Sequence, residues 1–139
     1  MSASANTKQG FLCQINANGH HLIADEPLSV GGKNLGPSPY DLLGSALATC
    51  TAMTLNMYAR HKKIDLEKVQ VTVDHDRIHA QDCSDCEKQS GKIDVFNRRI
   101  ILQGHLSTDQ ETRMLQIADR CPVHKTLENE IKITTEIDK

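Results

Sequence analysis

Alternating hydrophobic and polar positions predict strands on both sides of a long uncharged helix. Residues 69–73 alternate valine with polar residues, which is typical of a strand with one buried face. Residues 93–102 predict a second such strand, and isoleucines that recur at alternate positions in 131–137 predict a third. Residues 10–24 hold two short runs around an Asn-Gly pair, which is typical of a hairpin turn and predicts two more strands.

The segment from Leu42 to Ala59 carries no charge and predicts a buried helix. Its start is marked by Ser38 as a cap, by Pro39 at the first helical position and by Asp41 near the positive end of the helix dipole. Apolar and small residues lie on most of its faces rather than in one stripe, so the helix requires cover on most sides. One chain of 139 residues supplies too little of that cover, which predicts a homodimer.

Two shorter helices are predicted over 109–120 and 122–129, and residues 81–91 are predicted to form a polar loop. Strands that are grouped before and after helices, rather than alternating with them, predict an α+β fold instead of a wound parallel sheet. The length fits a single domain over residues 1–139.

Composition and charge exclude several classes of partner. The net charge of −2 and the pI near 6.4 give no general attraction to nucleic acid or to an anionic membrane. With two Phe, two Tyr and no Trp, the chain also has few side chains that could stack on bases. The uncharged segment contains Gly, Ser, Thr and Asn and is too polar to predict a membrane span. The first residues lack the apolar stretch of a secretory signal, which predicts a cytoplasmic location.

Three of the five cysteines lie within predicted elements or at their ends. Cys121 precedes Pro122, which ends one predicted helix and suits the start of the next, so a helix dipole favours a thiolate there, with Arg120 beside it. Cys50 lies in the middle of the uncharged helix, where a cysteine is usually a small core residue. Cys13 falls in a predicted strand and is interpreted as part of the core.

The other two cysteines, Cys83 and Cys86, form a C-x-x-C motif. A structural zinc site would require two further ligands, and the nearby His75 and His79 lie on a stretch that is predicted to be extended, which would not bring both rings to one point. An odd number of cysteines without an export signal also disfavours a disulfide framework. The motif is therefore interpreted as a polar loop with incidental thiols, and no metal is expected.

Two longer motifs, taken together, resemble the cysteine motifs of the OsmC/Ohr family (osmotically inducible protein C and organic hydroperoxide resistance). They are Gly-Pro-Ser-Pro-Tyr-Asp-Leu-Leu-Gly-Ser-Ala-Leu-Ala-Thr-Cys over 36–50 and Arg-Cys-Pro-Val-His-Lys-Thr-Leu over 120–127. The loop 83–91 and the following Arg98-Arg99 look like a variant branch of that family. The resemblance extends from about Val30 to the C-terminus.

This resemblance implies an intertwined α+β homodimer with antiparallel sheet regions around two long central helices. It also implies a cytoplasmic thiol peroxidase that needs no metal or organic cofactor. Cys50 would attack the O–O bond of an organic hydroperoxide and become a sulfenic acid, and Cys121 would condense with it to a disulfide. A dithiol reductant would then reopen the disulfide.

The chain departs from the best-studied branch at two positions. Peroxidases of the family stabilise the thiolate with an arginine from the N-terminal segment or the loop before the helix, and a glutamate ten residues before the first cysteine orients it. Here no arginine precedes Arg60, and Tyr40 holds the glutamate position with Asp41 beside it. Candidates for the missing cation are a residue of the partner subunit or one of four in this chain: His20, His21, Lys33 and Arg120.

The candidate catalytic residues are therefore Cys50, Cys121, Asp41 and Arg120. A second interpretation is a non-enzymatic family member that binds a small hydrophobic ligand in the groove around the central helices. A third is a zinc-binding protein that uses Cys83 and Cys86.

Overall fold

The first three strands form a small antiparallel sheet. The computed structural model describes residues 1–138, and the chain divides into two compact units, Met1–Ser45 and the residues from Ala46 onward. In the first unit, β1 (Ala3–Asn6), β2 (Cys13–Ala17) and β3 (His20–Ala24) pair in the order β1-β2-β3. The predicted hairpin over 10–24 is confirmed. Strand β1 is an additional strand that the sequence analysis does not predict.

The turn between β2 and β3 has the backbone that its sequence favours. Asn18 and Gly19 both have positive φ angles, 52° and 89°, which suits a two-residue hairpin turn. After β3, the buried carboxylate of Asp25 accepts the backbone N–H groups of Glu26, Lys33 and Leu35, at 2.8, 3.1 and 3.2 Å. The loop that contains the 3₁₀ turn η1 (Leu28–Val30) is thus organised around one side chain.

The uncharged segment forms helix α1 (Pro39–Lys62), as predicted. Asp41 Oδ2 accepts hydrogen bonds from the backbone N–H and the hydroxyl of Ser38, at 2.9 and 2.8 Å, and the Asp41 N–H donates to Ser38 Oγ at 3.2 Å. These backbone and side-chain hydrogen bonds from Ser38 hold the pKa of Asp41 below its ordinary value, although partial burial raises it. The described bonds of Asp41 are therefore those of a residue that caps a helix.

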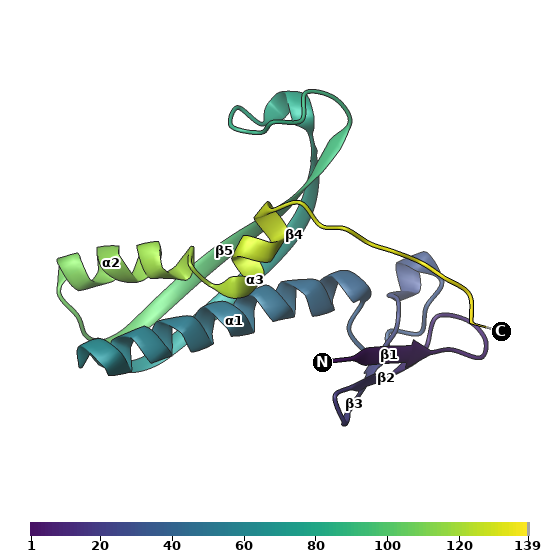
Figure 1. The fold of residues 1–139 in the computed structure, drawn as a ribbon, viewed down its shortest axis with the longest axis horizontal. Coiled ribbons are helices and arrows are strands. Elements are labelled where there is room, and N and C mark those ends of the chain that lie inside the picture. Colours follow the sequence, from purple (N-terminus) through teal and green to yellow (C-terminus); the bar gives the residue numbers. More distant parts are fainter. Residues whose placement is uncertain (139) are drawn as a thin grey trace. The chain divides into compact units, whose positions relative to one another are not determined.

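Two long strands dominate the second unit. β4 (Asp65–His79) and β5 (Lys92–His105) pair along their whole length as an antiparallel ribbon, so the predicted strands over 69–73 and 93–102 are confirmed and longer than expected. Figure 1 shows the ribbon ending in a loop, where the 3₁₀ turn η2 (Ala80–Asp82) precedes the C-x-x-C motif. The predicted polar loop is thus the tip of a two-stranded ribbon.

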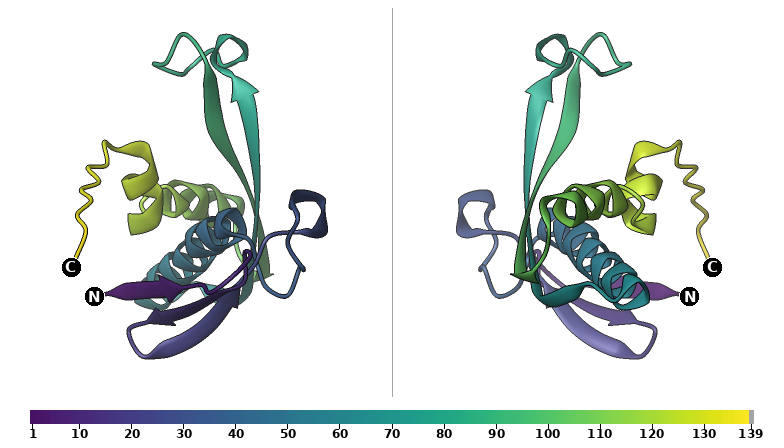
Figure 2. Two further views of the ribbon diagram at one scale, coloured as in Figure 1. Left: turned by 90° about the vertical axis from the view of Figure 1, so that its right-hand side faces the viewer. Right: turned by 90° about the vertical axis from the view of Figure 1, so that its left-hand side faces the viewer.

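Helices α2 (Thr108–Ala118) and α3 (Pro122–Glu128) follow β5 and confirm the two predicted C-terminal helices. Ser107 and Gln110 form a reciprocal capping box at the start of α2. Figure 2 shows α2 beside the part of α1 that belongs to this unit. The buried cluster between them consists of Leu55, Ala59, Met114, Ile117 and Ala118, and side chains of the ribbon such as Ile100 and Leu102 pack against it.

The predicted strand over 131–137 is wrong for the single chain. Residues 130–138 form no helix or strand, and Ile131, Ile133 and Ile137 are exposed. A strand is stable only when its backbone N–H and C=O groups pair with a neighbouring edge, and no described segment of this chain offers one to these residues. The α+β class with small antiparallel sheets is confirmed, and no described helix combines the length and hydropathy of a membrane span.

Candidate functional site

Cys50 and Cys121 lie together in the second unit. Cys50 projects from the middle of α1, Cys121 is the residue at which α3 begins, and the two side chains share a hydrogen bond. Cys121 is completely buried, whereas Cys50 is half-buried and remains partly accessible. The fold thus brings together the two cysteines that the sequence motifs single out, and it exposes only one of them to a reactant.

The junction between α2 and α3 positions Cys121. Its N–H donates to the carbonyl oxygen of Ala118 at 3.2 Å, and Pro122 then occupies the first position of α3. Cys121 Sγ accepts the backbone N–H of His124 at 3.4 Å, so the sulfur itself caps the helix. The predicted location of Cys121 at a helix N-terminus is confirmed.

The pKa values of the two thiols are shifted in opposite directions. Burial raises the pKa of the Cys121 thiol, but hydrogen bonds from Cys50, from the backbone N–H of His124 and from the Thr51 hydroxyl outweigh burial, and the pKa lies below its ordinary value. Burial also raises the pKa of Cys50, and the hydrogen bond with Cys121 raises it further, because Cys50 is the donor to the neighbouring sulfur. The first proton to leave the pair therefore leaves its charge on Cys121.

Arg98 is a residue near Cys121 that the sequence analysis did not name as a site candidate. It lies on β5, its side chain is only 12% exposed, and its guanidinium donates to Thr51 Oγ1 at 3.0 Å and to the carbonyl oxygen of Ala118 at 3.1 Å. A second guanidinium nitrogen pairs with Asp119 at 2.7 Å. The Thr51 hydroxyl thus bridges the Arg98 guanidinium and the Cys121 sulfur.

The Thr51 hydroxyl links Arg98 to the thiol pair. Its single hydrogen can reach the carbonyl oxygen of Leu47, at 2.8 Å, or the Cys121 sulfur. A charged acceptor forms the stronger bond, so ionisation of Cys121 turns the hydroxyl toward the sulfur. The donation from Arg98 to the same oxygen polarises the hydroxyl and strengthens this bond.

A signal for Arg98 was present in the strand pattern. On β5, residues 98, 100 and 102 alternate with exposed neighbours, and the two besides Arg98 are Ile and Leu. A charged residue in the inward register of an otherwise apolar strand face must find partners inside, because an unpaired buried charge is strongly unfavourable.

Arg120 is the candidate cation of the sequence analysis that belongs to the second unit. Arg120 is exposed and forms no ion pair with any residue of 1–138, whereas its neighbour Asp119 pairs with Arg98. His20, His21 and Lys33 belong to the first unit. Arg98 is the cation that donates to Thr51 and to the carbonyl oxygen of Ala118.

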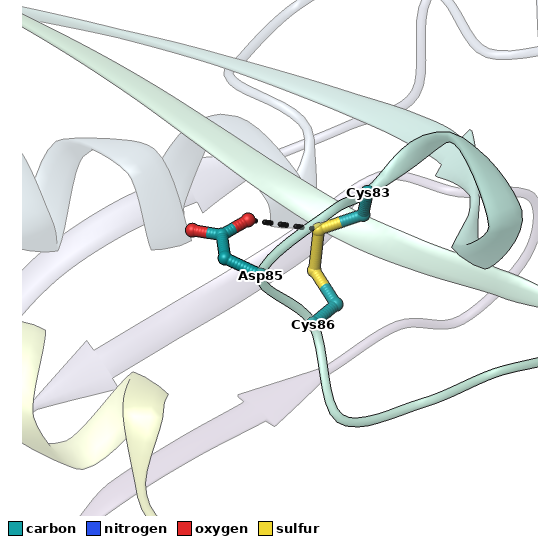
Figure 3. Close-up of side chains that lie close together, drawn as sticks. All are labelled: Cys83, Asp85 and Cys86. Atoms are coloured by element: carbon teal, nitrogen blue, oxygen red, sulfur yellow. Dashed lines mark hydrogen bonds between the residues drawn. A yellow bond between two sulfur atoms is a disulfide. The ribbon is translucent and has the colours of Figure 1, made fainter.

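Cys83 and Cys86 form a disulfide, so the interpretation of this motif as incidental thiols is wrong. Their Cα atoms are 5.5 Å apart, and Asp85 Oδ1 lies 3.3 Å from Cys83 Sγ, as Figure 3 shows. The two sulfurs and the Asp85 carboxylate could together offer ligands to a metal ion only when the disulfide is reduced. The short three-residue spacing at a turn is what permits the sulfurs to meet.

The disulfide forms part of the wall of a groove of about 580 Å³. Leu47 of α1 and His124 and Leu127 of α3 also line this groove. The Nε2 atom of the His124 ring lies 2.9 Å from a carboxylate oxygen of Glu128, which orients the ring. Apolar side chains of the ribbon, among them Ile78 and Phe96, complete the lining.

Comparisons with known proteins agree on the fold. The family model described as OsmC-like protein matches residues 31–136. A putative osmotic stress induced and detoxification response protein from Psychrobacter arcticus has 20% identity and a TM-score of 0.73, covering 91% of this chain and 87% of that one. An OsmC-like protein from Mycoplasma pneumoniae has 21% identity and a TM-score of 0.72, covering 91% and 86%. The organic hydroperoxide resistance protein OhrB of Bacillus subtilis has 15% identity and a TM-score of 0.63, covering 92% and 91%. No curated protein sequence matches the chain.

The first prediction concerns the hydroxyl that links Arg98 to the thiols. Thr51→Val keeps the shape of the side chain but removes a donor that lowers the pKa of Cys121, so the first ionisation of the pair should move to higher pH. At a pH below that pKa, raising the pKa by one lowers the thiolate fraction about tenfold. The measurement is thiolate absorbance against pH with Cys13, Cys83 and Cys86 replaced by serine, so that only the pair titrates.

Two further variants sharpen this test. Thr49→Val, the same replacement at an exposed position of α1, should leave the titration unchanged. Arg98→Gln should move the titration in the same direction as Thr51→Val, and Arg98→Lys by less, because it keeps the charge. A folded Thr51→Val variant with the titration of the unaltered pair would contradict the role assigned to the hydroxyl.

Proposed function

Because the chain belongs to the OsmC-like protein family, we propose that it is a thiol-dependent peroxidase that reduces organic hydroperoxides with Cys50 and Cys121. The observation that carries the proposal is the hydrogen-bonded thiol pair, in which one sulfur has a lowered pKa and the other is accessible. Structural neighbours named organic hydroperoxide resistance proteins, from Legionella pneumophila and Bacillus subtilis, support the same activity.

Accessibility assigns the attack on the peroxide to Cys50. The Cys121 sulfur carries the first negative charge but is fully buried, whereas Cys50 is half-buried and can meet a substrate. The proton of Cys50 passes along their hydrogen bond to Cys121, and the Cys50 sulfur attacks the terminal oxygen of the hydroperoxide. The O–O bond breaks, the alkoxide takes the proton that Cys121 received and leaves as an alcohol, and Cys50 becomes a sulfenic acid.

Cys121 then completes the oxidation. It is again a thiolate and attacks the Cys50 sulfur; the disulfide forms, the S–O bond breaks, and the departing hydroxide takes a proton from solvent to become water. Arg98 and Thr51 act on Cys121 through the bonds described above. They stabilise the Cys121 thiolate before the peroxide is reduced and again before the disulfide forms. A dithiol restores the pair by thiol–disulfide exchange, which requires no metal or organic cofactor.

One observation favours the non-enzymatic alternative. Burial raises the pKa of Cys50, which by itself describes an unreactive thiol beside an apolar groove that could hold a hydrophobic ligand. The two functions differ in whether Cys50 can lose its proton. A peroxidase requires this ionisation, and the neighbouring Cys121 sulfur can accept the proton in place of water.

A homodimer is part of the proposal. On α1, Met53 is 65% exposed and Met57 is 72% exposed, although an unpartnered surface helix normally carries polar residues there. The exposed isoleucines of 131–137 are a second apolar segment without a partner among residues 1–138. A second copy of this chain that covers α1 would bury the exposed methionines. The strand edges of that copy could pair with the segment 131–137.

The second prediction tests the thiol chemistry directly. With cumene hydroperoxide and a dithiol, Cys50→Ser should abolish turnover, and Cys121→Ser should slow it, because that variant lacks the sulfur that accepts the Cys50 proton and closes the disulfide. Cys13→Ser is the matched control and should leave turnover unchanged. Peroxide consumption by Cys50→Ser at the rate of the unaltered protein would show that the peroxidase proposal is wrong and would leave the ligand-binding function.

The third prediction concerns the choice of substrate. Burial of about 100 Å² of an aryl group against the groove would contribute about 2.5 kcal/mol, and hydrogen peroxide offers no such area. The ratio of kcat/KM for cumene hydroperoxide to that for hydrogen peroxide should therefore exceed about tenfold. Leu127→Ala should lower this ratio, whereas Leu115→Ala, at an exposed position of α2, should not. Equal kcat/KM values for the two peroxides would exclude the groove as the substrate site.

The fourth prediction tests the dimer. Met53→Glu with Met57→Glu should convert the protein to a monomer, because two carboxylates would replace the exposed methionines on the face of α1. Light scattering at micromolar concentration measures the mass, and Leu115→Glu on α2 is the control for adding charge to an exposed apolar position. A monomeric unaltered protein would contradict the homodimer.

A further inference from the structure

We propose that Cys83 and Cys86 are a second redox couple, which in its reduced form reopens the Cys50–Cys121 disulfide from the groove that the motif lines. The inference rests on the proposed peroxidase function and adds an internal electron donor to it. In the structure Cys83 and Cys86 are joined while Cys50 and Cys121 are free, so the motif can close to a disulfide without a change in the other pair.

The groove connects the two pairs of cysteines. Cys83 and Cys86 line it together with Leu47 of α1 and His124 of α3. Leu47 precedes Cys50 by three residues on α1, which places the two side chains on the same helical face about one turn apart. The backbone N–H of His124 donates to the Cys121 sulfur. Each half of the buried pair therefore lies within one helical turn of a residue that lines the groove.

A donor of this kind suits the Cys50–Cys121 pair because the pair is only partly accessible. A reductant must bring its own sulfur into contact with Cys50 or Cys121, and Cys121 is fully buried within the unit. The C-x-x-C motif, in contrast, lies at the tip of the ribbon with half-buried cysteines and exposed Ser84 and Asp85 between them. A bulky external dithiol can reach this tip, and the tip can in turn reach the groove.

The contact requires a movement that the ribbon geometry allows. The strands of the ribbon form a two-stranded sheet, and beyond Ile78 and Ile93 only the loop remains. Two-stranded ribbons are marginally stable by themselves, so their ends bend more easily than the middle of a larger sheet. Bending of the tip across the groove brings its sulfurs toward α1.

Exposure and leaving-group chemistry select the sulfur that is attacked. Cys50 is half-buried and Cys121 fully buried, so Cys50 is the sulfur that a thiolate can approach. Attack there expels Cys121, and the lowered pKa of Cys121 makes it the better leaving group of the two. Both considerations favour a mixed disulfide that includes Cys50.

The exchange then proceeds in two balanced steps. A thiolate of the reduced Cys83/Cys86 pair bonds to the Cys50 sulfur, the Cys50–Cys121 bond breaks, and Cys121 leaves with the electron pair. The remaining thiolate of the motif attacks its neighbour, the mixed disulfide breaks, and Cys50 leaves with the second pair. The two protons of the original dithiol finish on the buried cysteines. An external dithiol afterwards reduces Cys83–Cys86 by the same reaction.

The charges around the motif favour electron flow in this direction. Asp85 Oδ1 lies 3.3 Å from Cys83 Sγ, and Asp82 and Glu87 flank the motif in the sequence. Nearby carboxylates disfavour thiolates, so they give the reduced motif none of the stabilisation that makes a disulfide strongly oxidising. The Cys83–Cys86 disulfide is therefore favoured, and the dithiol is a good donor to the buried pair.

The experiment follows which disulfide is present after a single oxidation. Fully reduced Cys13→Ser protein receives one equivalent of cumene hydroperoxide, is quenched with acid at intervals and alkylated, and its disulfide-linked peptides are identified by mass spectrometry. The Cys50–Cys121 disulfide should form first and be replaced by Cys83–Cys86. In Cys83→Ser/Cys86→Ser, Cys50–Cys121 should persist, and in either single serine variant a mixed disulfide with Cys50 should accumulate. Ser84→Ala, which keeps both motif cysteines, should behave as the unaltered protein.

Two results would overturn the inference without affecting the peroxidase. One is a Cys50–Cys121 disulfide that lasts as long with the motif intact as in Cys83→Ser/Cys86→Ser. The other is a Cys83–Cys86 disulfide that forms equally fast in Cys50→Ser, since the peroxide would then oxidise the motif directly. If no Cys50–Cys121 disulfide forms even in Cys83→Ser/Cys86→Ser, the proposed function itself fails, and the relay fails with it.

Discussion

The buried guanidinium of Arg98 joins the parts of the second unit that build the site. It donates to Thr51 on α1 and to the Ala118 carbonyl at the end of α2, and it pairs with Asp119 at the α2–α3 junction. The same Ala118 carbonyl accepts the N–H of Cys121. Loss of this cation would leave buried polar groups without partners, at about 1–3 kcal/mol for each. One side chain of β5 therefore fixes both the place of Cys121 and the polarity around it.

In this arrangement the negative charge lies on one sulfur, and a reactant can approach only the other. The sulfur that is stabilised as a thiolate is the buried one, held by helix N–H groups and by Thr51, and the sulfur that a reactant can approach is its hydrogen-bonded neighbour. Neither cysteine combines both properties. The chemistry that we propose depends on proton transfer between them, and the same division makes Cys121 the natural leaving group when the disulfide is reopened.

Much of the local structure was predictable because it depends on neighbouring residues alone. The capped start of α1 at Ser38, the hairpin turn at Asn18 and the helix that begins at Cys121 follow from short-range preferences for caps, positive φ angles and proline. The strand over 131–137 failed for the opposite reason. Its alternating pattern is real, but a strand also requires an edge to pair with, and the single chain does not supply one among residues 1–138.

The sequence by itself determined which residue types are available: a cysteine within an uncharged helix, a cysteine before a proline, and a C-x-x-C motif in a polar loop. Only the tertiary structure decided their relations. It placed Cys50 against Cys121, joined Cys83 to Cys86, and brought Arg98, rather than Arg120, to Thr51. Hydrogen bonds and charge stabilisation act over a few ångströms through space, and most of the residues concerned are separated by tens of positions along the chain, so the fold alone sets those distances.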